Sequence, residues 1–322
     1  MKKNKYAPII LFTYCRPEHT KQTVEALLKN KEAVESDLFI YSDAPQNKNA
    51  LEGVKKTREY IKAVSGFKSV SIVERKENWG LAKNLIDGIT TVINKFGRAI
   101  IVEDDIVTSP YFLRFMNEAL ERYKNTIEVA TIHGYMMPLD NADLLPEAFL
   151  SSWHGCWGWA TWKENWDAFN PDALNLYQTI RESGRADYFD LDRSQRFTAM
   201  LMYHYYGIVN SWAIRWYASN FVLGRLCLHP NKSLVKQLGL DGGPGATHSR
   251  RINTTCFSFS TRPINWDNVQ MGVQEDMMAR ASIVNYKRKH WNKRYRLIWF
   301  LHCTHLEKLL FGNKLRRLRW YY

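Results

Sequence analysis

RAIIVEDDIV, residues 98–107, decides how this sequence folds, because it joins a run of apolar residues to three consecutive acids. Its first part, residues 98–102, contains an uninterrupted apolar run of the kind found in strands that are buried on both faces. Glu103, Asp104 and Asp105 follow at the point where such a strand leaves the core. The stretch therefore predicts a central strand that delivers carboxylates to one edge of a sheet.

The first 110 residues repeat this pattern, with short apolar runs that alternate with amphipathic segments. Continuous apolar strands that are separated by helices are typical of a parallel sheet with helices on both faces. We therefore expect an α/β fold whose mixed, mainly parallel sheet is flanked by helices. The predicted strands cover residues 7–14, 36–42, 69–74, 98–102 and 129–134, and the predicted helices cover residues 18–29, 49–64, 80–96 and 109–123.

A polar side chain follows each of the first four predicted strands. Arg16, Asp43 and Arg75 follow the first three strands, and the acids at residues 103–105 follow the fourth. In open α/β sheets, ligands bind beyond the carboxyl ends of the strands. These residues are therefore the first candidates for a functional site.

The three acids have a plain interpretation and a chemical one. Acidic triplets commonly open a solvated loop. Their position directly after a buried strand favours a metal site instead, because carboxylate oxygens suit Mg²⁺ or Mn²⁺, which share their coordination with substrate phosphates. Such a metal would neutralise a diphosphate leaving group.

Composition limits the class of protein and its compartment. The length of 322 residues and the apolar fraction of 45% are those of a globular chain with a sizeable core. Five cysteines without a CxxC spacing argue against a disulfide framework or a zinc site and for a reducing compartment. The first apolar run is followed by RPEH and not by a small-residue cleavage site, and no run of about 18 apolar residues occurs, so we expect neither a signal peptide nor a transmembrane helix.

The composition of the sequence changes after residue 150. SSWHGCWGWATWKENWDAF, residues 151–169, is rich in tryptophan, and a helical region and the segment NSWAIRWYASNFVLGRLCLHP follow it. LGLDGGPGATHS, residues 238–249, is rich in glycine. A loop with this composition can close over a bound ligand.

Seven motifs occur in order between residues 9 and 249, namely ILFTYCRPEHTKQTVEALL, YSDAP, NWGLAKNLIDGI, VEDD, CWGWATWKENWDAF, NSWAIRW and GATHS. Together they resemble nucleotide-sugar glycosyltransferases of the GT-A (Rossmann-like) fold, the family 2 type of bacterial polysaccharide synthesis and the N-acetylglucosaminyltransferase I branch. The resemblance implies a glycosyltransferase domain over residues 1–286, with a nucleotide-sugar-binding half (1–135) and an acceptor half (136–286). It also implies a metal-dependent enzyme that moves a sugar, by inversion, from a nucleotide-diphosphate sugar to a glycan or lipid-linked glycan acceptor in the synthesis of surface polysaccharide such as lipopolysaccharide.

The resemblance assigns five residues to the donor nucleotide, for which we expect a UDP-sugar. Thr13 and Arg16 match the strand-end segment that lies along the nucleotide, and Asp43 matches the acid that contacts the base. Arg75 and Lys83 fall where the family holds the ribose and phosphates. Each has a plainer alternative, because Asp before Ala-Pro often caps a turn and isolated basic residues are mostly exposed surface charges.

The acidic motif and a distant histidine are the predicted metal and diphosphate ligands. Glu103, Asp104 and Asp105 match the family motif, whose last aspartate binds Mn²⁺ or Mg²⁺. We therefore expect Glu103 and Asp104 at the donor and Asp105 at the metal. His248, in the glycine-rich stretch, falls where a C-terminal histidine completes the metal or diphosphate contacts, and loop residues often carry such functions.

Tryptophans of the two later motifs are candidates for the acceptor site. An exposed indole face fits the CH face of a sugar, and we expect Trp157, Trp159 and Trp212 to contact the acceptor, with Trp159 as the first choice. The plainer alternative is that these rings pack in the core, since tryptophan is usually buried in good part.

The general base is the one part of the expected mechanism that the sequence leaves open. In the relatives an aspartate just before the tryptophan of NSWAIRW removes the proton of the acceptor hydroxyl, but this sequence has Asn210 and Ser211 there. Three explanations stand side by side. Asp192 or His204 supplies the base, and the imidazole has the better matched pKa; or Asn210 positions the acceptor; or an acid of the EDD motif is the base.

The basic character of the protein belongs to its last segment. Eleven of the 45 Lys and Arg residues lie in residues 287–322, against the single acid Glu307, so this tail carries +10 of the net charge of +13. Basic residues mixed with Trp, Leu, Phe and Tyr are typical of an amphipathic helix in a membrane interface, where each contributes about 1 kcal/mol on an anionic leaflet. We expect a cytoplasmic enzyme that this tail holds peripherally at the inner face of the membrane; the plainer alternative is a soluble helix with a charged face.

Two other functions and one class of partner are alternatives to the transferase. A nucleotidyltransferase would favour a glycine-rich loop after the first strand, and TYCRPEHT lacks glycine. A non-catalytic or weakly active sugar-nucleotide-binding protein would explain the missing acid at residue 210. A nucleic-acid-binding domain would spread its positive charge over the folded surface, so we expect no nucleic-acid partner.

Overall fold

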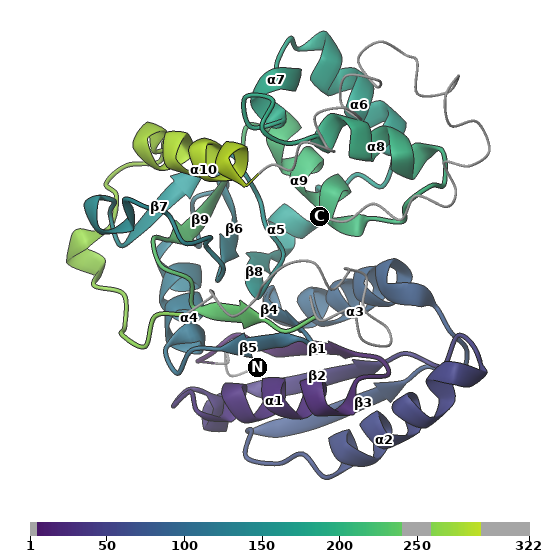
Figure 1. Ribbon diagram of the computed structural model, residues 1–322. Coiled ribbons are helices and arrows are strands. Elements are labelled where there is room, and N and C mark those ends of the chain that lie inside the picture. Colours follow the sequence, from purple (N-terminus) through teal and green to yellow (C-terminus); the bar gives the residue numbers. More distant parts are fainter. Residues whose placement is uncertain (1–4, 240–258, 291–322) are drawn as a thin grey trace.

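Eight strands form the central sheet of the protein, whose computed structural model describes residues 5–239 and 259–290 (Figure 1). Along the sheet the strands are β3 (Ser69–Glu74), β2 (Asp37–Ser42), β1 (Ile9–Thr13), β4 (Arg98–Glu103), β8 (Trp159–Trp162), β6 (Val129–His133), β9 (Leu226–Pro230) and β7 (Ala148–Ser151). A separate two-stranded sheet pairs β10 (Val235–Gln237) with β5 (Ile106–Thr108).

The central sheet is mixed and mainly parallel. β3, β2, β1 and β4 are parallel to one another, and β6 is parallel to β9. β8 runs antiparallel to both β4 and β6, so these two strands point the same way, and β7 runs antiparallel to β9. The predicted fold class, a mainly parallel sheet flanked by helices, is therefore confirmed.

The helices fall into two groups (Figure 1). α1, α2 and α3 alternate with the first strands, and α6, α7, α8 and α9 gather at the other end of the molecule beside α10. The helices are α1 (Pro17–Leu28), α2 (Leu51–Lys62), α3 (Gly80–Phe96), α4 (Phe112–Arg122), α5 (Lys163–Trp166), α6 (Ala173–Glu182), α7 (Ala186–Phe189), α8 (Phe197–Tyr205), α9 (Trp212–Val222) and α10 (Met277–Lys289), with 3-10 turns η1 (Ala33–Glu35), η2 (Lys48–Ala50), η3 (Ala142–Leu144) and η5 (Trp266–Asn268).

Local sequence explains where the first helices begin and end. Pro17 stands in the first turn of α1, where its missing N–H costs no hydrogen bond. Gly97 ends α3 in the left-handed region, with φ of 75°, and its N–H donates to the carbonyl of Ile93. The chain then enters β4 at the next residue, so α3 and β4 are joined without a loop.

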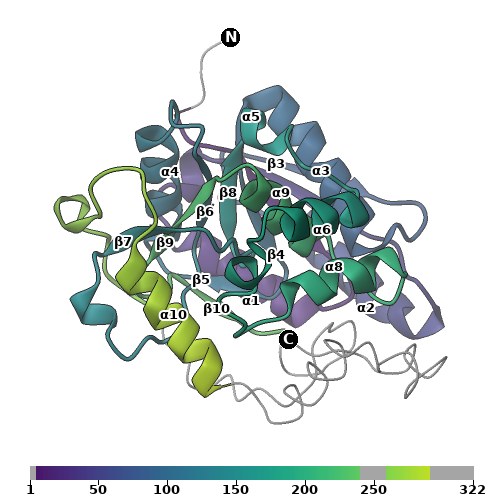
Figure 2. The ribbon, with the colours of Figure 1, turned by 90° about the horizontal axis from the view of Figure 1, so that it is seen from above.

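Alternate residues of β1 face two separate cores. Ile9 and Leu11 belong to the cluster that contains buried residues of α1 and α4, whereas Ile10 and Phe12 belong to the cluster built on α3. This alternation follows from the period of two in a strand, and it requires apolar residues on both faces. Figure 2 shows α3 and α5 together on one side of the sheet and α10 on the other.

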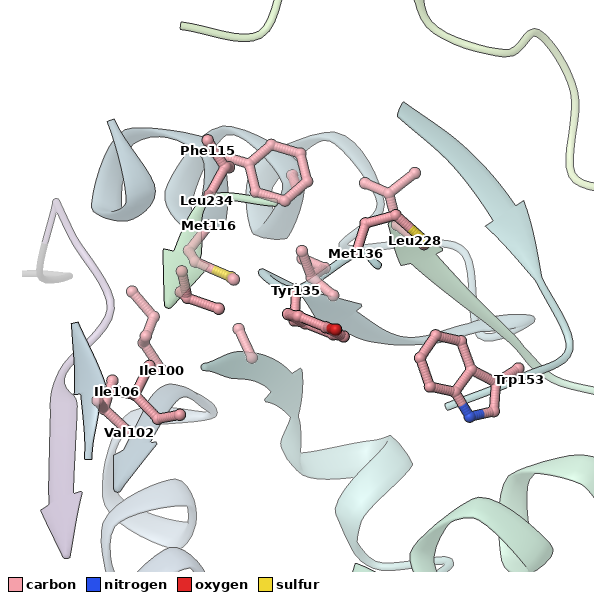
Figure 3. Close-up of a cluster of buried hydrophobic side chains, with 14 of the residues drawn as sticks. Ile100, Val102, Ile106, Phe115, Met116, Tyr135, Met136, Trp153, Leu228 and Leu234 are labelled. Carbon is pink, nitrogen blue, oxygen red and sulfur yellow. The ribbon is translucent and has the colours of Figure 1, made fainter. Parts of the chain in front are cut away.

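The larger core extends from β4 across to β9 (Figure 3). Ile100 and Val102 of β4, Phe115 and Met116 of α4 and Leu228 of β9 all lie in this cluster. It therefore joins the first half of the sheet to the second half through side chains that are fully buried or nearly so.

The second half of the sheet differs most from the sequence-based expectation. The Trp-rich stretch contains β8, an antiparallel strand inserted between β4 and β6, which was not predicted. The division at residue 286 stays a prediction, and the basic tail beyond His290 lies outside the described residues. Within the part of the chain that the structure describes, no helix has the length and apolarity needed to cross a membrane.

Candidate active site at the ends of β1 and β4

Two adjacent parallel strands bring the predicted donor residues to one edge. β1 pairs with β4 in the register Ile9↔Ile100 to Phe12↔Glu103, so residues 13–16 and 103–105 leave the sheet side by side. β2 continues the same edge, because the N–H of Asp43 donates to the carbonyl of Thr13 at 3.1 Å. The sequence-based placement of a site at these strand ends is therefore geometrically consistent.

Arg16 lies between the two aspartates of the acidic motif. Its Nη2 donates to Asp104 Oδ1 at 2.5 Å and to Asp105 Oδ2 at 2.8 Å. Asp104 Oδ2 also accepts from the N–H of Tyr14 at 3.2 Å, and the Asp104 carbonyl accepts from Thr23 Oγ1 at 2.9 Å. The three charged side chains are each nine-tenths buried or close to it, so the acids are fixed by β1 and α1 rather than solvated in a loop.

Burial dominates the electrostatics of this group. It raises the pKa of Glu103 to about 8, with further upward contributions from Asp105 and Asp104. It also raises the pKa of Asp104 to about 6, although Arg16 acts in the opposite direction. Burial works against the charge on Arg16, but the two aspartates outweigh it and raise the pKa of the guanidinium. The edge therefore holds more acid than its single paired cation neutralises.

Within residues 5–239 and 259–290, four buried polar atoms at this edge have no hydrogen-bond partner. They are Asp105 Oδ1, Thr13 Oγ1, and Nε and Nη1 of Arg16. Buried polar groups are normally paired, so an acceptor and several donors are left for a ligand. Asp105 Oδ1 is the hard oxygen that Mn²⁺ or Mg²⁺ would take, so the residues fit such an ion. The described residues contain no cluster of three metal-binding side chains, so substrate oxygens and water would complete the coordination.

The glycine-rich segment begins directly on these acids. β10 pairs with β5, and the next N–H, that of Leu238, donates to the Asp105 carbonyl at 2.8 Å. At Gly239 an added Cβ would lie 2.0 Å from Asp105 Oδ2 and 2.8 Å from Arg16 Nη1, so any other residue would displace the Asp105 and Arg16 side chains. This contact was not predicted, although the high glycine content of the segment was its signal. His248 lies outside the described residues.

Asp43 is bound to the start of α3 by both of its carboxylate oxygens. Oδ1 accepts from the N–H of Trp79 and Oδ2 from the N–H of Gly80, both at 2.9 Å, and Asn78 Nδ2 lies 3.2 Å from Oδ2. The plainer role of Asp43, a cap, is thus present in the structure, because the carboxylate also accepts from the N–H of Ala44 in its own turn at 2.9 Å. Its contact with a nucleotide base stays a prediction.

Arg75 and Lys83 both lie against the ring of Trp79. Cζ of Arg75 is 3.9 Å from the ring centroid and Nζ of Lys83 is 4.1 Å from it. Arg75 is mostly buried, donates from Nε to Asn84 Oδ1 at 2.8 Å and pairs with Asp87. Lys83 is exposed, so it is the freer of the two cations for a phosphate. Trp79, in the motif NWGLAKNLIDGI, orders both and was not singled out from the sequence.

The prediction of a tryptophan surface for the acceptor is wrong for two of the three rings. Trp159 and Trp212 are 0% and 3% exposed and stack on each other at 5.5 Å, within a cluster that includes Trp166 and Trp216. A buried ring has no free face for a sugar. Trp157 is partly exposed, so its contact with the acceptor stays a prediction.

A chain of two buried histidines holds the segment that carries Trp157. The Trp157 N–H donates to His133 Nε2 at 3.1 Å, so we assign the proton of His133 to Nδ1, which lies 3.2 Å from His229 Nδ1. His229 Nε2 then donates to the Trp153 carbonyl at 2.8 Å. Burial lowers the pKa of His229 to about 4 and that of His133 well below its usual value, so both rings are neutral.

The four candidates for the general base lie in two different parts of the structure. Ser211 donates from its N–H to His204 Nδ1 at 3.3 Å, and its Oγ accepts from the Ile214 N–H at 3.3 Å to cap α9. Asn210 is exposed beside them. Asp192 lies elsewhere, in an ion pair of 2.7 Å with Arg280 and with no contact to the acidic motif among the described residues. The structure thus groups three candidates and separates the fourth, and their roles stay predictions.

No protein-family model and no curated protein matches the sequence. Among solved structures, the chain is similar to TarS from S. aureus, at 12% identity and a TM-score of 0.30, over 41% of this chain and 23% of TarS. It is also similar to the mannosyltransferase PcManGT from Pyrobaculum calidifontis in complex with GDP-Man and Mn²⁺, at 12% identity and a TM-score of 0.35, over 67% of this chain and 74% of that chain. A third similar structure, UDP-glucose pyrophosphorylase complexed with UDP-glucose, has 13% identity and a TM-score of 0.27, over 53% of this chain and 79% of that chain.

Proposed function

We propose that this protein is a nucleotide-sugar glycosyltransferase that moves a sugar from a nucleotide-diphosphate donor to a glycan or lipid-linked glycan acceptor. One observation carries the proposal. Arg16, Asp104 and Asp105 converge at the carboxyl ends of two parallel strands and leave buried, unpartnered polar atoms there. An acceptor oxygen and guanidinium donors at one point are what a cation and a diphosphate require together.

The donor would lie along the edge formed by β1, β2 and β4. The unpartnered Nε and Nη1 of Arg16 would donate to diphosphate oxygens, and exposed Lys83 would add a second positive charge. Asp105 would hold Mn²⁺ or Mg²⁺, and the bound ion would neutralise charge on the departing diphosphate. Glu103, whose pKa burial and the two aspartates raise in the free protein, would lie beside the donor sugar.

The transfer itself needs one bond made and one broken. The acceptor hydroxyl oxygen attacks the anomeric carbon, the bond from that carbon to the diphosphate oxygen breaks, and the hydroxyl proton goes to a base. We infer that His204 is the base, because it adjoins Ser211 and Asn210 and burial lowers its pKa, which keeps the imidazole neutral; its Nδ1 lone pair would have to exchange the hydrogen bond from the Ser211 N–H for one from the acceptor hydroxyl. Asp192 is less suited, since Arg280 already occupies its carboxylate.

A weakly active or non-catalytic sugar-nucleotide-binding protein is the second candidate. The observation that favours it is the state of the residues at the expected base position. The side chain of Asn210 is an amide, which is not a base. The Ser211 hydroxyl is engaged as the cap of α9, where it accepts a hydrogen bond from the Ile214 N–H. This candidate shares the donor site with the first and differs only in turnover.

Nucleotide release tests the proposed activity. We expect the full chain to release UDP or another nucleoside diphosphate from one of a panel of nucleotide sugars in Mn²⁺, and Asp105→Asn to lose at least about 100-fold in rate. Asp143→Asn is the matched control, because Asp143 is an exposed acid paired only with Lys232. Binding without release by the wild type would support the second candidate, and release that survives in Asp105→Asn would overturn the assignment of the site.

A further inference from the structure

A cavity of about 400 Å³ lies at the opposite edge of the sheet from the acidic motif. It is lined by Leu226, the first residue of β9, and by Ser152, directly after β7. β9 points the same way as β1 and β4, and β7 is antiparallel to it, so this edge carries the amino ends of the parallel strands. The cavity is therefore separate from the proposed active site, which lies at the carboxyl ends.

The acids of the cavity are already satisfied by protein groups. Glu275 Oε1 accepts from the N–H and Oγ of Ser152, both at 2.9 Å, and Oε2 accepts from the Tyr188 hydroxyl. Asp192 pairs with Arg280 at 2.7 Å, and Asp187 pairs with Arg193. These carboxylates therefore fix the wall of the cavity rather than offering charge to a ligand.

Two arginines of the cavity have no acidic partner among the described residues. Arg185 precedes α7, and its Cζ lies 4.4 Å from the ring centroid of Phe221, which keeps the guanidinium over an aromatic face. Arg225 lies between α9 and β9, and its Nη1 is buried without a hydrogen-bond partner. The two guanidiniums come from different elements and line the same cavity. Unpaired guanidiniums with free donors are the protein groups best suited to phosphate or carboxylate.

The other lining groups indicate the size and kind of molecule. The volume lies within the range of about 300–1,000 Å³ that is usual for small-molecule sites. Tyr188 is partly exposed and offers ring surface, and Arg280 supports it from a distance of 3.4 Å between Cζ and the ring centroid. The Tyr188 hydroxyl donates to Glu275 and keeps acceptor capacity for a hydroxyl group of a polyol.

We propose that this cavity is a second binding site, distinct from the donor site, for a sugar-sized molecule that carries a phosphate or carboxylate group. Arg185 and Arg225 bind the anionic group, and the partly exposed ring of Tyr188 contacts the rest of the ligand. The site does not depend on the transferase activity proposed above, because none of its residues takes part in donor binding.

Calorimetric titration of the full chain with three probes tests the site. We expect glucose 6-phosphate or glucuronate to bind, neutral glucose to bind at least about tenfold more weakly, and Arg225→Gln or Arg185→Gln to weaken the anionic probe by about tenfold or more. The two anionic probes distinguish a phosphate ligand from a carboxylate ligand. Arg262→Gln, at an exposed arginine outside the cavity, is the matched control and keeps wild-type affinity.

Arg185 is exposed, so its substitution leaves the fold intact. Arg185→Gln therefore tests anion binding in the cavity even if Arg225→Gln is destabilised. UDP binding, measured on the same samples, is expected to be unchanged in both variants, which separates this site from the donor site. Failure of both anionic probes to bind would overturn the proposal. Equal binding of glucose, or anion binding that both variants retain in full, would also overturn it.

Discussion

A single guanidinium holds two buried carboxylates together at the proposed donor site. Arg16 donates to Asp104 and Asp105 from one nitrogen and keeps its other two nitrogens unpartnered. Removing one member of a buried ion pair leaves uncompensated charge, which typically costs about 3–5 kcal/mol. Arg16 therefore stabilises the free protein in the place where a divalent cation would bind.

Arg16 and a metal ion should compete for the same acids. We expect Arg16→Gln to lower the melting temperature in EDTA and to bind Mn²⁺ at least about tenfold more tightly than the wild type, because the guanidinium no longer repels the ion. Paramagnetic resonance of free Mn²⁺ measures the affinity without nucleotide, and added Mn²⁺ should restore the melting temperature. Arg98→Gln, in an ion pair with the exposed Glu121, is the control. Unchanged or weaker Mn²⁺ binding in Arg16→Gln would show that the two cations do not share the acids.

Single residues show what the sequence could reveal about the site. The acids and Arg16 were predictable because each follows a buried strand, and parallel strands end at one edge. Trp159 was misplaced because aromatic residues that bind sugars and those that fill cores are the same residue types. Its burial depends on Trp212 and Trp216, which are about fifty residues away in sequence and reach it only through the tertiary fold.

At the level of elements, a carboxylate on one strand end holds the start of the next helix. Asp43 accepts from the backbone of Trp79 and Gly80 and thereby fixes α3 against β2. We expect Asp43→Asn to lower the free energy of unfolding by about 2 kcal/mol, since an amide nitrogen would face backbone N–H groups. Asp172→Asn is the control, because the exposed Asp172 caps α6 and asparagine caps equally well. Chemical denaturation measures the free energy of unfolding of both variants. An equal decrease in Asp43→Asn and Asp172→Asn would argue against the role given to Asp43.

The histidine chain that holds the segment before β8 makes a prediction about pH. His229 has its pKa lowered to about 4 by burial, whereas the unfolded value is about 6.5, so the unfolded state binds the proton first as the pH falls. The stabilisation that the neutral His229 ring provides to the folded state is complete above about pH 6.5 and is lost as the pH falls toward 4.

Substitution of His229 should therefore flatten the acid side of the stability profile. Between pH 7 and pH 4 we expect the free energy of unfolding to fall by on the order of 3 kcal/mol more in the wild type than in His229→Gln. Urea denaturation at a series of pH values measures this difference, and His290→Asn, at an exposed histidine after α10, serves as the control. Parallel profiles for wild type and His229→Gln would contradict the neutral assignment of the ring.

The elements were predictable throughout the first half of the sheet, whereas in the second half only the strand over residues 129–134 was, which the structure has as β6. β1 to β4 and the helices between them follow the alternation of apolar runs and amphipathic segments, whereas their order, β3-β2-β1-β4, with β4 beside β1 and not beside β3, is visible only in the structure. β8 could not be predicted in its place, because four residues of Trp-rich sequence carry no periodic signal and their partners β4 and β6 are distant in sequence.

Taken as a whole, the molecule uses the two edges of one sheet differently. At the carboxyl ends of β1 and β4, Asp105 has an unpartnered oxygen atom and Arg16 has unpartnered nitrogen atoms among the described residues. At the amino end of β9 lies a cavity lined by Arg185 and Arg225, which have no acidic partner in the same part of the chain. The first edge suits a nucleotide diphosphate with a metal, and the second suits an anionic sugar. The donor site is the central claim, because both candidate functions require it.

Thermal unfolding of the full chain with a panel of UDP-, GDP- and dTDP-sugars, each with and without Mn²⁺, tests that claim most directly. We expect one nucleotide sugar with Mn²⁺ to raise the melting temperature of the wild type and of Asp143→Asn by roughly 5 °C at about 100-fold excess over Kd. Asp105→Asn should show little or no shift under the same conditions. A panel in which no nucleotide sugar stabilises the wild type, or one in which Asp105→Asn is stabilised equally, would contradict the assignment of the donor site.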